Sequence, residues 1–197
     1  MPEALSLGFD TSAAHCAAAL LQGGRVLAHR HEDMAKGQAE RLFPLLAEVI
    51  AEGGVDWHDL SVIGVGTGPG NFTGIRIAVA AARGLALSLG IPAVGVGVTE
   101  ALALDLPRPC RVAIPARAGE VIWQDFGTGH DTRPDQGVLH ALPPGPPVLD
   151  PVHPLAVAIA RIALDRREQP DLPRPAPIYL RPADAAPARD RGPVILT

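Results

Sequence analysis

The stretch Gly66-Thr67-Gly68-Pro69-Gly70-Asn71-Phe72-Thr73-Gly74 is the most unusual part of this sequence and decides the expected fold. An apolar run at 61–65 precedes it, and an alanine- and leucine-rich run of helical length at 75–89 follows it. A strand that passes through glycines into a helix can cradle a phosphate, because backbone N–H groups and the helix dipole attract anions. Neither a P-loop ending nor a GxGxxG register fits the loop. Phosphate binding by Gly66, Gly68 and Gly70 and a purely structural tight turn therefore both remain open.

Asp10-Thr11-Ser12 is a second candidate for phosphate chemistry. The triplet lies between two short apolar runs, 4–9 and 16–21, and a glycine turn leads into a third run at 25–31. Their nearly continuous apolar character predicts buried strands in a β-meander. A carboxylate and two hydroxyls at a strand end, opposite a glycine loop, suit magnesium and phosphate. An ordinary turn stabilised by these side chains is the alternative.

The segment 38–52 is predicted to be an amphipathic helix. Its apolar residues recur at spacings of three and four, and Pro44 is expected to kink the helix or to mark its first turn. The stripe is most simply core, yet together with the apolar helix at 75–89 it could equally form a partner surface. With a further strand and a helix that Thr99 would cap, the first part of the chain reads as an α/β domain with a mixed sheet. The stripe comprises Leu42, Leu45, Leu46, Val49 and Ile50.

Proline divides the chain into two different parts. Of the 21 prolines, four precede residue 106 and seventeen follow it. We therefore predict an N-terminal α/β lobe at 1–106 and a shortened, proline-rich C-terminal lobe at 107–197. The second lobe is expected to hold a hairpin around 116–120, a structureless loop or stiff linker at 127–147, and a helix at 155–167.

Charge, aromatic content and cysteine usage exclude several function classes. Residues 1–106 hold six basic and eleven acidic side chains, and aromatic residues make up 4% of the chain, so neither a duplex-binding basic face nor a base-stacking platform is expected. Cys16 and Cys110 have no CxxC spacing, and His29 and His31 are more simply a solvated strand edge than a metal site. Because we find no signal-peptide pattern and no run of roughly 20 apolar residues, we expect a cytoplasmic protein without a membrane span.

Several segments together resemble the TsaB family, also called YeaZ. Residues 68–76 are similar to its highly specific G-P-G-S-F-T-G-[VI]-R signature, and the resemblance is close over 5–104. Beyond that point it thins: Pro115 stands where the family carries an aspartate, and the chain before residue 177 is shorter than in usual members. The other matching segments are Asp10-Thr11-Ser12, Cys16-Ala17-Ala18-Ala19-Leu20, Ala39-Glu40-Arg41-Leu42-Phe43-Pro44, Gly84-Leu85-Ala86-Leu87, Gly95-Val96, Glu100-Ala101-Leu102-Ala103, Ala116-Arg117-Ala118-Gly119-Glu120-Val121 and Pro177-Ile178-Tyr179-Leu180-Arg181.

The resemblance implies an actin/Hsp70-like ATPase (ribonuclease H-like) fold of two lobes, of which the second is trimmed. It implies a scaffold subunit with no catalytic residue and no metal, because catalysis belongs to a TsaD-type paralogue that carries the metal-binding histidines. A small TsaE-type ATPase joins that pair. The complex transfers a threonylcarbamoyl group to N6 of adenosine 37 in tRNAs that read codons starting with A. The chain would meet tRNA only through the complex and would pair with itself when alone.

The resemblance also implies where the partner docks. Family members use the two helices that follow the meander, here 38–52 and 75–89. Glutamate in place of Leu46 or Val49 is thus expected to abolish docking while leaving the fold intact. The strand-end triplet and the glycine loop would form a degenerate site for ATP or ADP with magnesium. The implied interface comprises Leu42, Leu45, Leu46, Val49, Ile50, Arg76, Val79 and Arg83.

Two alternatives to a scaffold role remain. An autonomous ATPase or kinase would use Asp10 and the glycine loop, but it would also need a second phosphate loop and an adenosine site in the proline-rich lobe. A peptidase would need a metal triad or a nucleophile with its base, and the sequence has neither a metal-ligand pattern nor a G-x-S-x-G elbow. We therefore expect that the chain is not itself an enzyme.

Overall fold

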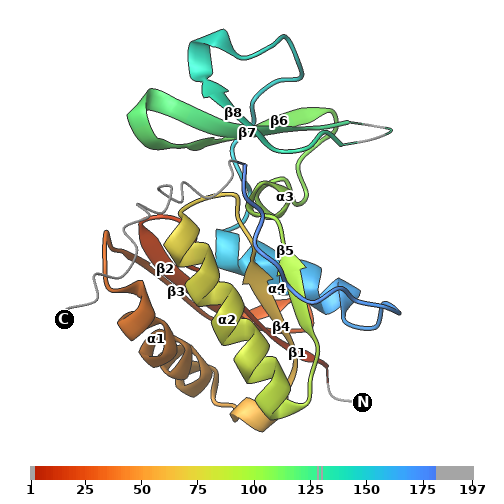
Figure 1. Cartoon of the computed structure of the whole chain (residues 1–197). Coiled ribbons are helices and arrows are strands. Elements are labelled where there is room, and N and C mark those ends of the chain that lie inside the picture. Colours follow the sequence, from red (N-terminus) through yellow and green to blue (C-terminus); the bar gives the residue numbers. More distant parts are fainter. Residues whose placement is uncertain (1–2, 128, 130, 181–197) are drawn as a thin grey trace, which may run out of the picture.

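A five-stranded mixed sheet organises the first part of the protein in the computed structural model, which describes residues 3–127, 129 and 131–180 (Figure 1). The strand order is β3-β2-β1-β4-β5; β1 pairs antiparallel with β2 and parallel with β4, and β5 extends the parallel part. The predicted meander and mixed sheet are confirmed. The strands are β1 (Leu5–Asp10), β2 (His15–Gln22), β3 (Arg25–Asp33), β4 (Leu60–Gly66) and β5 (Ala93–Val96).

Helices cover both faces of this sheet (Figure 1). α1 (Gln38–Gly53) and α2 (Phe72–Leu89) lie on one face, and α4 (Leu155–Arg166) lies on the other. A short turn, η1 (Trp57–Asp59), leads from α1 into β4. Because helices cover both faces, β1 and the middle of β2 are buried on both sides. The bulkiest fully buried residues of the main core under α1 and α2 are Leu7, Phe9, Leu20, Leu42, Leu45, Leu46, Ile63 and Ile75.

α4 ties the second half of the chain to the first sheet. It follows the proline-rich region, yet its Ile159 packs in one cluster with Val62 of β4. Glycines in the strands permit this approach: a Cβ on Gly8 would lie 2.5 Å from the carbonyl oxygen of Ala156, and one on Gly64 would lie 2.8 Å from that of Ile159. A division of the chain at residue 106 remains a proposal, and under it α4 would belong to the core of the first sheet.

A second, separate sheet of three antiparallel strands, β6-β7-β8, lies beyond α3 (Val98–Leu102) and the end of β5 (Figure 1). β6 (Cys110–Pro115) and β7 (Glu120–Phe126) make the predicted hairpin around the short turn η2 (Arg117–Gly119). The prediction of a structureless loop at 127–147 is wrong, because β8 (Asp135–Val138) and η3 (Leu139–Ala141) lie within it. β8 has only four residues, none of them buried, and it is held by backbone pairing with β7. Its sequence therefore shows no alternation of apolar and polar residues that would have predicted a strand.

One ion pair fixes the proline-rich loop on this second sheet. Arg111 Nε and Nη2 lie 2.5 and 2.8 Å from the two carboxylate oxygens of Asp125, and Arg111 Nη1 donates to the carbonyl oxygen of Pro143 at 2.8 Å. The guanidinium also lies 4.4 Å from the centre of the Trp123 ring. The hydrogen bonds to Asp125 raise the pKa of Arg111. A bidentate pair of this kind positions the loop where regular secondary structure does not.

Two predictions about helix starts need correction. Pro44 lies inside α1, so of the two alternatives its place in the first turn is wrong; the carbonyl of Glu40 cannot receive a bond from residue 44, and a kink there stays a prediction. The helix α3 (Val98–Leu102) begins after Gly97, not at Glu100. Thr99 does not cap it, because the Thr99 hydroxyl donates to Gln124 instead.

Arg41 links α1 to the edge strand β3. Its guanidinium lies 2.6 Å from Glu32 Oε1 and 2.7 Å from Glu48 Oε1, and these hydrogen bonds hold the pKa of both glutamates below the usual value. A lowered carboxyl pKa contributes stability that is present at neutral pH and lost as the pH falls through the folded-state pKa. We therefore expect Arg41→Gln to lower the melting temperature at pH 7, by an amount that shrinks as the pH falls below about 4.3, the ordinary pKa of glutamate.

Thermal melts of the wild type and Arg41→Gln at pH 7 and under acidic conditions check this expectation. Arg25→Gln is the control for loss of a positive charge, because Arg25 donates to the neutral amide of Gln22. A difference in melting temperature that is equally large at both pH values would show that Arg41 stabilises the protein by packing rather than by its ion pairs.

Candidate functional site

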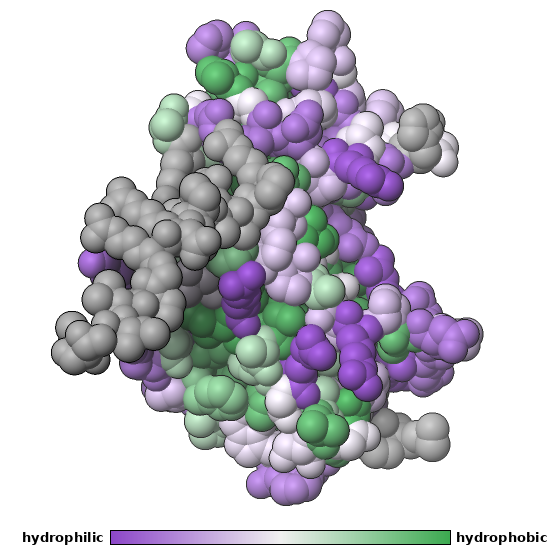
Figure 2. All heavy atoms as spheres, in the orientation of Figure 1, coloured by the Kyte–Doolittle hydropathy of each residue, from purple (hydrophilic) through white to green (hydrophobic). Residues whose placement is uncertain are grey.

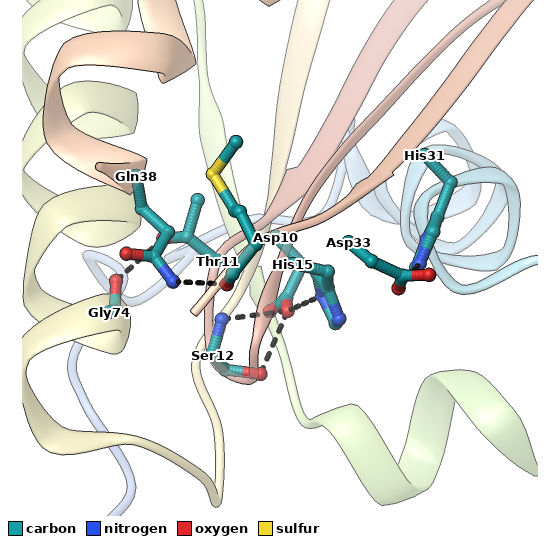
Figure 3. A network of polar contacts seen from close by, with 9 residues as sticks. Asp10, Thr11, Ser12, His15, His31, Asp33, Gln38 and Gly74 are labelled. Carbon is teal, nitrogen blue, oxygen red and sulfur yellow. Dashed lines mark hydrogen bonds and ion pairs between the residues drawn. The ribbon is translucent and has the colours of Figure 1, made fainter. Parts of the chain in front are cut away.

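The glycine-rich loop and the strand-end triplet lie directly against each other. The N–H of Asn71 donates to the carbonyl oxygen of Ser12 at 2.5 Å. Thr11 Oγ1 donates to the carbonyl oxygen of Gly74 at 2.7 Å, as Figure 3 shows. A Cβ on Gly74 would lie 1.9 Å from the carbonyl oxygen of Thr11, and a Cβ on Gly70 would lie 2.3 Å from the carbonyl oxygen of Ser12. Close backbone contact therefore accounts for these glycines, as in the tight-turn interpretation. The predicted phosphate-site residues all lie in these two loops or at the strand ends that lead into them: Asp10, Thr11, Ser12, Gly66, Gly68 and Gly70.

Asp10 is the centre of a buried polar network at the end of β1 (Figure 3). Its Oδ1 accepts from the N–H and the hydroxyl of Ser12, both at 2.8 Å, and lies 2.8 Å from His15 Nε2. Its Oδ2 lies against Gly66 and has no hydrogen-bond partner among the described residues. Ser12 donates to Asp10 rather than to His15, so the three residues do not form the relay of nucleophile and base that a peptidase needs.

Neighbouring histidines and cysteines add no reactive group to this network. His15 and His31 have ring centres 5.0 Å apart, and His31 lies 3.2 Å from Asp33 (Figure 3). Within the described ranges, no group of three or more His, Cys, Asp or Glu side chains is arranged to hold a metal ion. Burial raises the pKa of the Cys16 thiol to about 11, so this thiol stays protonated at neutral pH and is a poor nucleophile.

The leucine stripe of α1 faces the core of the protein itself, so most residues of the predicted partner interface are buried within the chain. Leu46 and Val49 are fully buried in the main core. The physical reason is that a helix covering a sheet buries its widest apolar stripe against that sheet. Arg76 and Arg83 of the predicted interface are exposed on α2. The buried members are Leu42, Leu45, Leu46, Val49, Ile50 and Val79.

An apolar groove of about 520 Å³ lies between α1 and α2, and Leu42 is the one residue of the buried stripe that lines it. Phe43 of α1 lines it and is 48% exposed; Leu87 of α2 is 87% exposed and precedes the lining residue Ser88 in the chain without itself lining the groove. Hydrophobic residues gather over this face of the molecule in Figure 2. The lining residues are Ala39, Leu42, Phe43, Ile77, Ala80, Ala81, Gly84, Leu85 and Ser88.

α2 is also the one helix in the described part of the chain that is long and apolar enough to cross a membrane. Length and composition alone are weak evidence, because core helices of soluble proteins meet the same criteria. The inner side of α2 is buried, with Ile75 and Ala82 fully enclosed in the main core. The apolar character of α2 therefore has a structural explanation.

A second cavity, of about 400 Å³, lies between the ends of β4 and β5 and the second sheet; we refer to it as the inter-sheet cleft. Gln124 of β7 accepts from the Thr99 hydroxyl and donates to the carbonyl oxygen of Thr132 at 2.7 Å. Glu100 lines the cleft and forms an ion pair with Arg166 of α4. This cavity was not predictable from the sequence, because Thr99, Gln124 and the C-terminal residues that line it come from distant segments that share no motif.

Comparison with known proteins shows which family this chain resembles. The model of the family TsaD, tRNA N6-adenosine threonylcarbamoyltransferase, matches residues 29–142, which is more than half of the chain. The tRNA threonylcarbamoyladenosine biosynthesis protein TsaB of Escherichia coli (strain K12) is 34% identical over 139 residues, or 68% of this chain and 58% of that protein. The chain belongs to the TsaB family.

Two solved structures of proteins from Pseudomonas aeruginosa are similar to this chain in their three-dimensional fold. YeaZ has a TM-score of 0.68 at 29% identity, and an uncharacterized protein with similarity to peptidase YEAZ has a TM-score of 0.72 at 26% identity. Each comparison covers 90% of this chain and 100% of the other. The fold is the actin/Hsp70-like ATPase (ribonuclease H-like) fold. This TsaB-family chain spans little more than half the length of the E. coli protein.

Proposed function

We propose that this TsaB-family chain is an accessory subunit that docks onto a TsaD-type catalytic partner in tRNA threonylcarbamoyladenosine biosynthesis. The observation that carries the proposal is the apolar groove between α1 and α2, which Phe43 lines with an exposed ring, while Leu87 is exposed on α2, which also supplies lining residues of the groove. An exposed apolar groove with a large aromatic side chain is typical of interaction sites. The names of the relatives, TsaB and TsaD, supply the pathway and the partner.

Charges on the two helices beside the groove indicate which partner surface would fit them. α2 carries Arg76 and Arg83 and no acidic residue, whereas α1 carries three glutamates and only one arginine, Arg41. A partner whose helices present the opposite order of charges would be complementary to both helices. A second copy of the chain, related by a twofold axis, offers that order as well. We therefore include a homodimer of the free protein in the proposal.

In this proposal the chain contributes no catalytic group. Ser12 and His15 already engage Asp10 Oδ1, and the glycine-rich loop packs on the neighbouring backbone. Transfer of the threonylcarbamoyl group to N6 of adenosine 37 falls to the TsaD-type partner, with a TsaE-type ATPase in the same complex. The tRNA binds through that complex, in the cytoplasm.

Leu87→Glu is expected to weaken docking at least about tenfold without unfolding the chain. The added carboxylate stays in water in the free protein, because Leu87 is 87% exposed, but docking would bury it without a partner. Phe43→Ala, which removes the exposed ring from the groove, should act in the same direction. Calorimetric titration against the TsaD-type partner measures both effects, and thermal melts of the free variants confirm the fold.

Val152→Glu is the matched control for the docking experiment. Val152 is 57% exposed and lies just before α4, outside the groove, so the same added charge should leave docking unchanged. Wild-type affinity in both Leu87→Glu and Phe43→Ala would show that the groove is not the docking surface, and the proposal would fail.

An autonomous nucleotide-dependent enzyme of the same fold is the second candidate. Asp10 and the glycine-rich loop favour it, because they lie at the carboxyl ends of β1 and β4, where open α/β sheets bind ligands. Calorimetry of the isolated chain with Mg²⁺-ATP tests this alternative. Saturable binding with hydrolysis would support it, and no binding at millimolar nucleotide would reject it.

A further inference from the structure

The C-terminal segment 173–179 crosses the carboxyl ends of β4 and β5 and contacts the glycine-rich loop. The N–H of Ile178 donates to the carbonyl oxygen of Thr67 at 2.8 Å, so the segment is hydrogen-bonded to the first residue after β4. Pro175 is buried over β5, where a Cβ on Gly95 would lie 3.2 Å from its Cα. These two contacts hold the segment on the loop from one side of the cleft. Arg181 of the matching C-terminal motif lies outside the described residues.

A cluster of three side chains fastens the end of this segment to α2. Arg76 Nε donates to the hydroxyl of Tyr179 at 2.9 Å, and the Arg76 guanidinium carbon lies 3.7 Å from the centre of the Phe72 ring. The Phe72 and Tyr179 rings are 4.8 Å apart. Cation–π and ring contacts of this kind reinforce the hydrogen bond. Residues more than a hundred positions apart are thereby joined at the first turns of α2.

The segment occupies the place where a ligand would approach. In open α/β sheets, ligands bind in the crevice beyond the carboxyl ends of the parallel strands. Here β1, β4 and β5 end at one edge, and the segment forms a wall of the inter-sheet cleft at that edge. A phosphate that approached the glycine-rich loop from the cleft would meet this wall. The wall residues are Pro173, Arg174, Pro175, Ala176 and Ile178.

We propose that residues 173–179 are a strap that closes the glycine-rich loop to phosphate-bearing ligands, with the Arg76–Tyr179 contact as its latch. The proposal does not rest on the docking function, because it concerns the strand ends and not the groove between α1 and α2. It accounts for a glycine-rich loop that lies at the strand ends, where open α/β sheets bind ligands, and that the segment contacts at Thr67.

The experiment opens the strap and measures access to the loop. Ile178→Pro removes the N–H that donates to Thr67, and Tyr179→Ala removes the latch, so the double variant loses both fastenings. Amide hydrogen exchange over 66–74 is expected to become about 10- to 100-fold faster in the double variant. Exchange in β1 should stay at the wild-type rate, which shows that the sheet is intact. Asp171→Asn is the control, because its positive φ of 59° suits asparagine and it touches neither fastening.

Mg²⁺-ADP is the ligand probe for the opened loop. The double variant is expected to bind it at least about tenfold more tightly than the wild type, because the accessible state is no longer rare. Equal exchange rates over 66–74 in the double variant and the wild type would overturn the strap. Faster exchange without a gain in Mg²⁺-ADP affinity would overturn the claim that the strap guards a phosphate site.

Discussion

Leu46→Glu is expected to unfold the protein and not merely to release a docking partner. Leu46 is fully buried, in the same core cluster as strand residues of the first sheet. A glutamate there has either to bury a charge or to become protonated in apolar surroundings, and it also displaces the leucine that fills the space. We expect a loss of about 4 kcal/mol or more in the free energy of unfolding. Typical domains have roughly 5–15 kcal/mol in total, so little folded protein would remain.

Ala47→Glu provides the matched control, because Ala47 is the next residue on α1 and is exposed. The same charge at this position should leave the unfolding free energy within about 0.5 kcal/mol of the wild type. Circular dichroism with urea denaturation compares the three proteins. A Leu46→Glu protein that folds cooperatively with wild-type stability and has lost its partner would restore the interface first expected from the sequence.

Periodicity predicted α1 correctly but could not assign its faces. Apolar residues at spacings of three and four identify an amphipathic helix, and both a core and a docking surface prefer the same residue types. The decision depends on where the sheet lies, which is tertiary information. The stripe that includes Leu46 packs on the sheet, whereas Ala39 and Phe43, outside that stripe, line the groove.

The sequence predicted that the strand-end triplet and the glycine-rich loop lie close together, but it could not predict whether a phosphate or the neighbouring backbone fills the space between them. Parallel pairing of β1 with β4 places Asp10 and Gly66 at the same edge of the sheet, and the alternating strands and helices made that arrangement expected. A glycine, however, admits a phosphate and a neighbouring backbone equally well. The choice between them depends on long-range contacts, such as the bond from the Asn71 N–H to Ser12, that no local pattern encodes. The same reason explains why the contact between Thr67 and Ile178 was not predicted.

Gly8→Ala is expected to destabilise the protein by about 3 kcal/mol through one added methyl group. Gly8 lies within β1, and its Cβ would stand 2.5 Å from the carbonyl oxygen of Ala156 and 2.6 Å from the nitrogen of Ala160. Both are backbone atoms of α4, which cannot rotate aside as the tip of a side chain can. The helix would therefore have to move away from the sheet as a unit, and the packing of Ile159 against β4 would loosen with it.

Urea denaturation of Gly8→Ala beside Gly84→Ala separates this packing effect from the intrinsic effect of replacing glycine. An added Cβ on Gly84 meets no heavy atom within 4 Å, so alanine in this exposed turn of α2 should stabilise the protein by roughly 0.5–1 kcal/mol. Wild-type stability in Gly8→Ala would mean that α4 lies farther from β1 than this backbone contact allows. The opposite signs expected for the two substitutions thus test whether a helix that follows the proline-rich region completes the core of the first sheet.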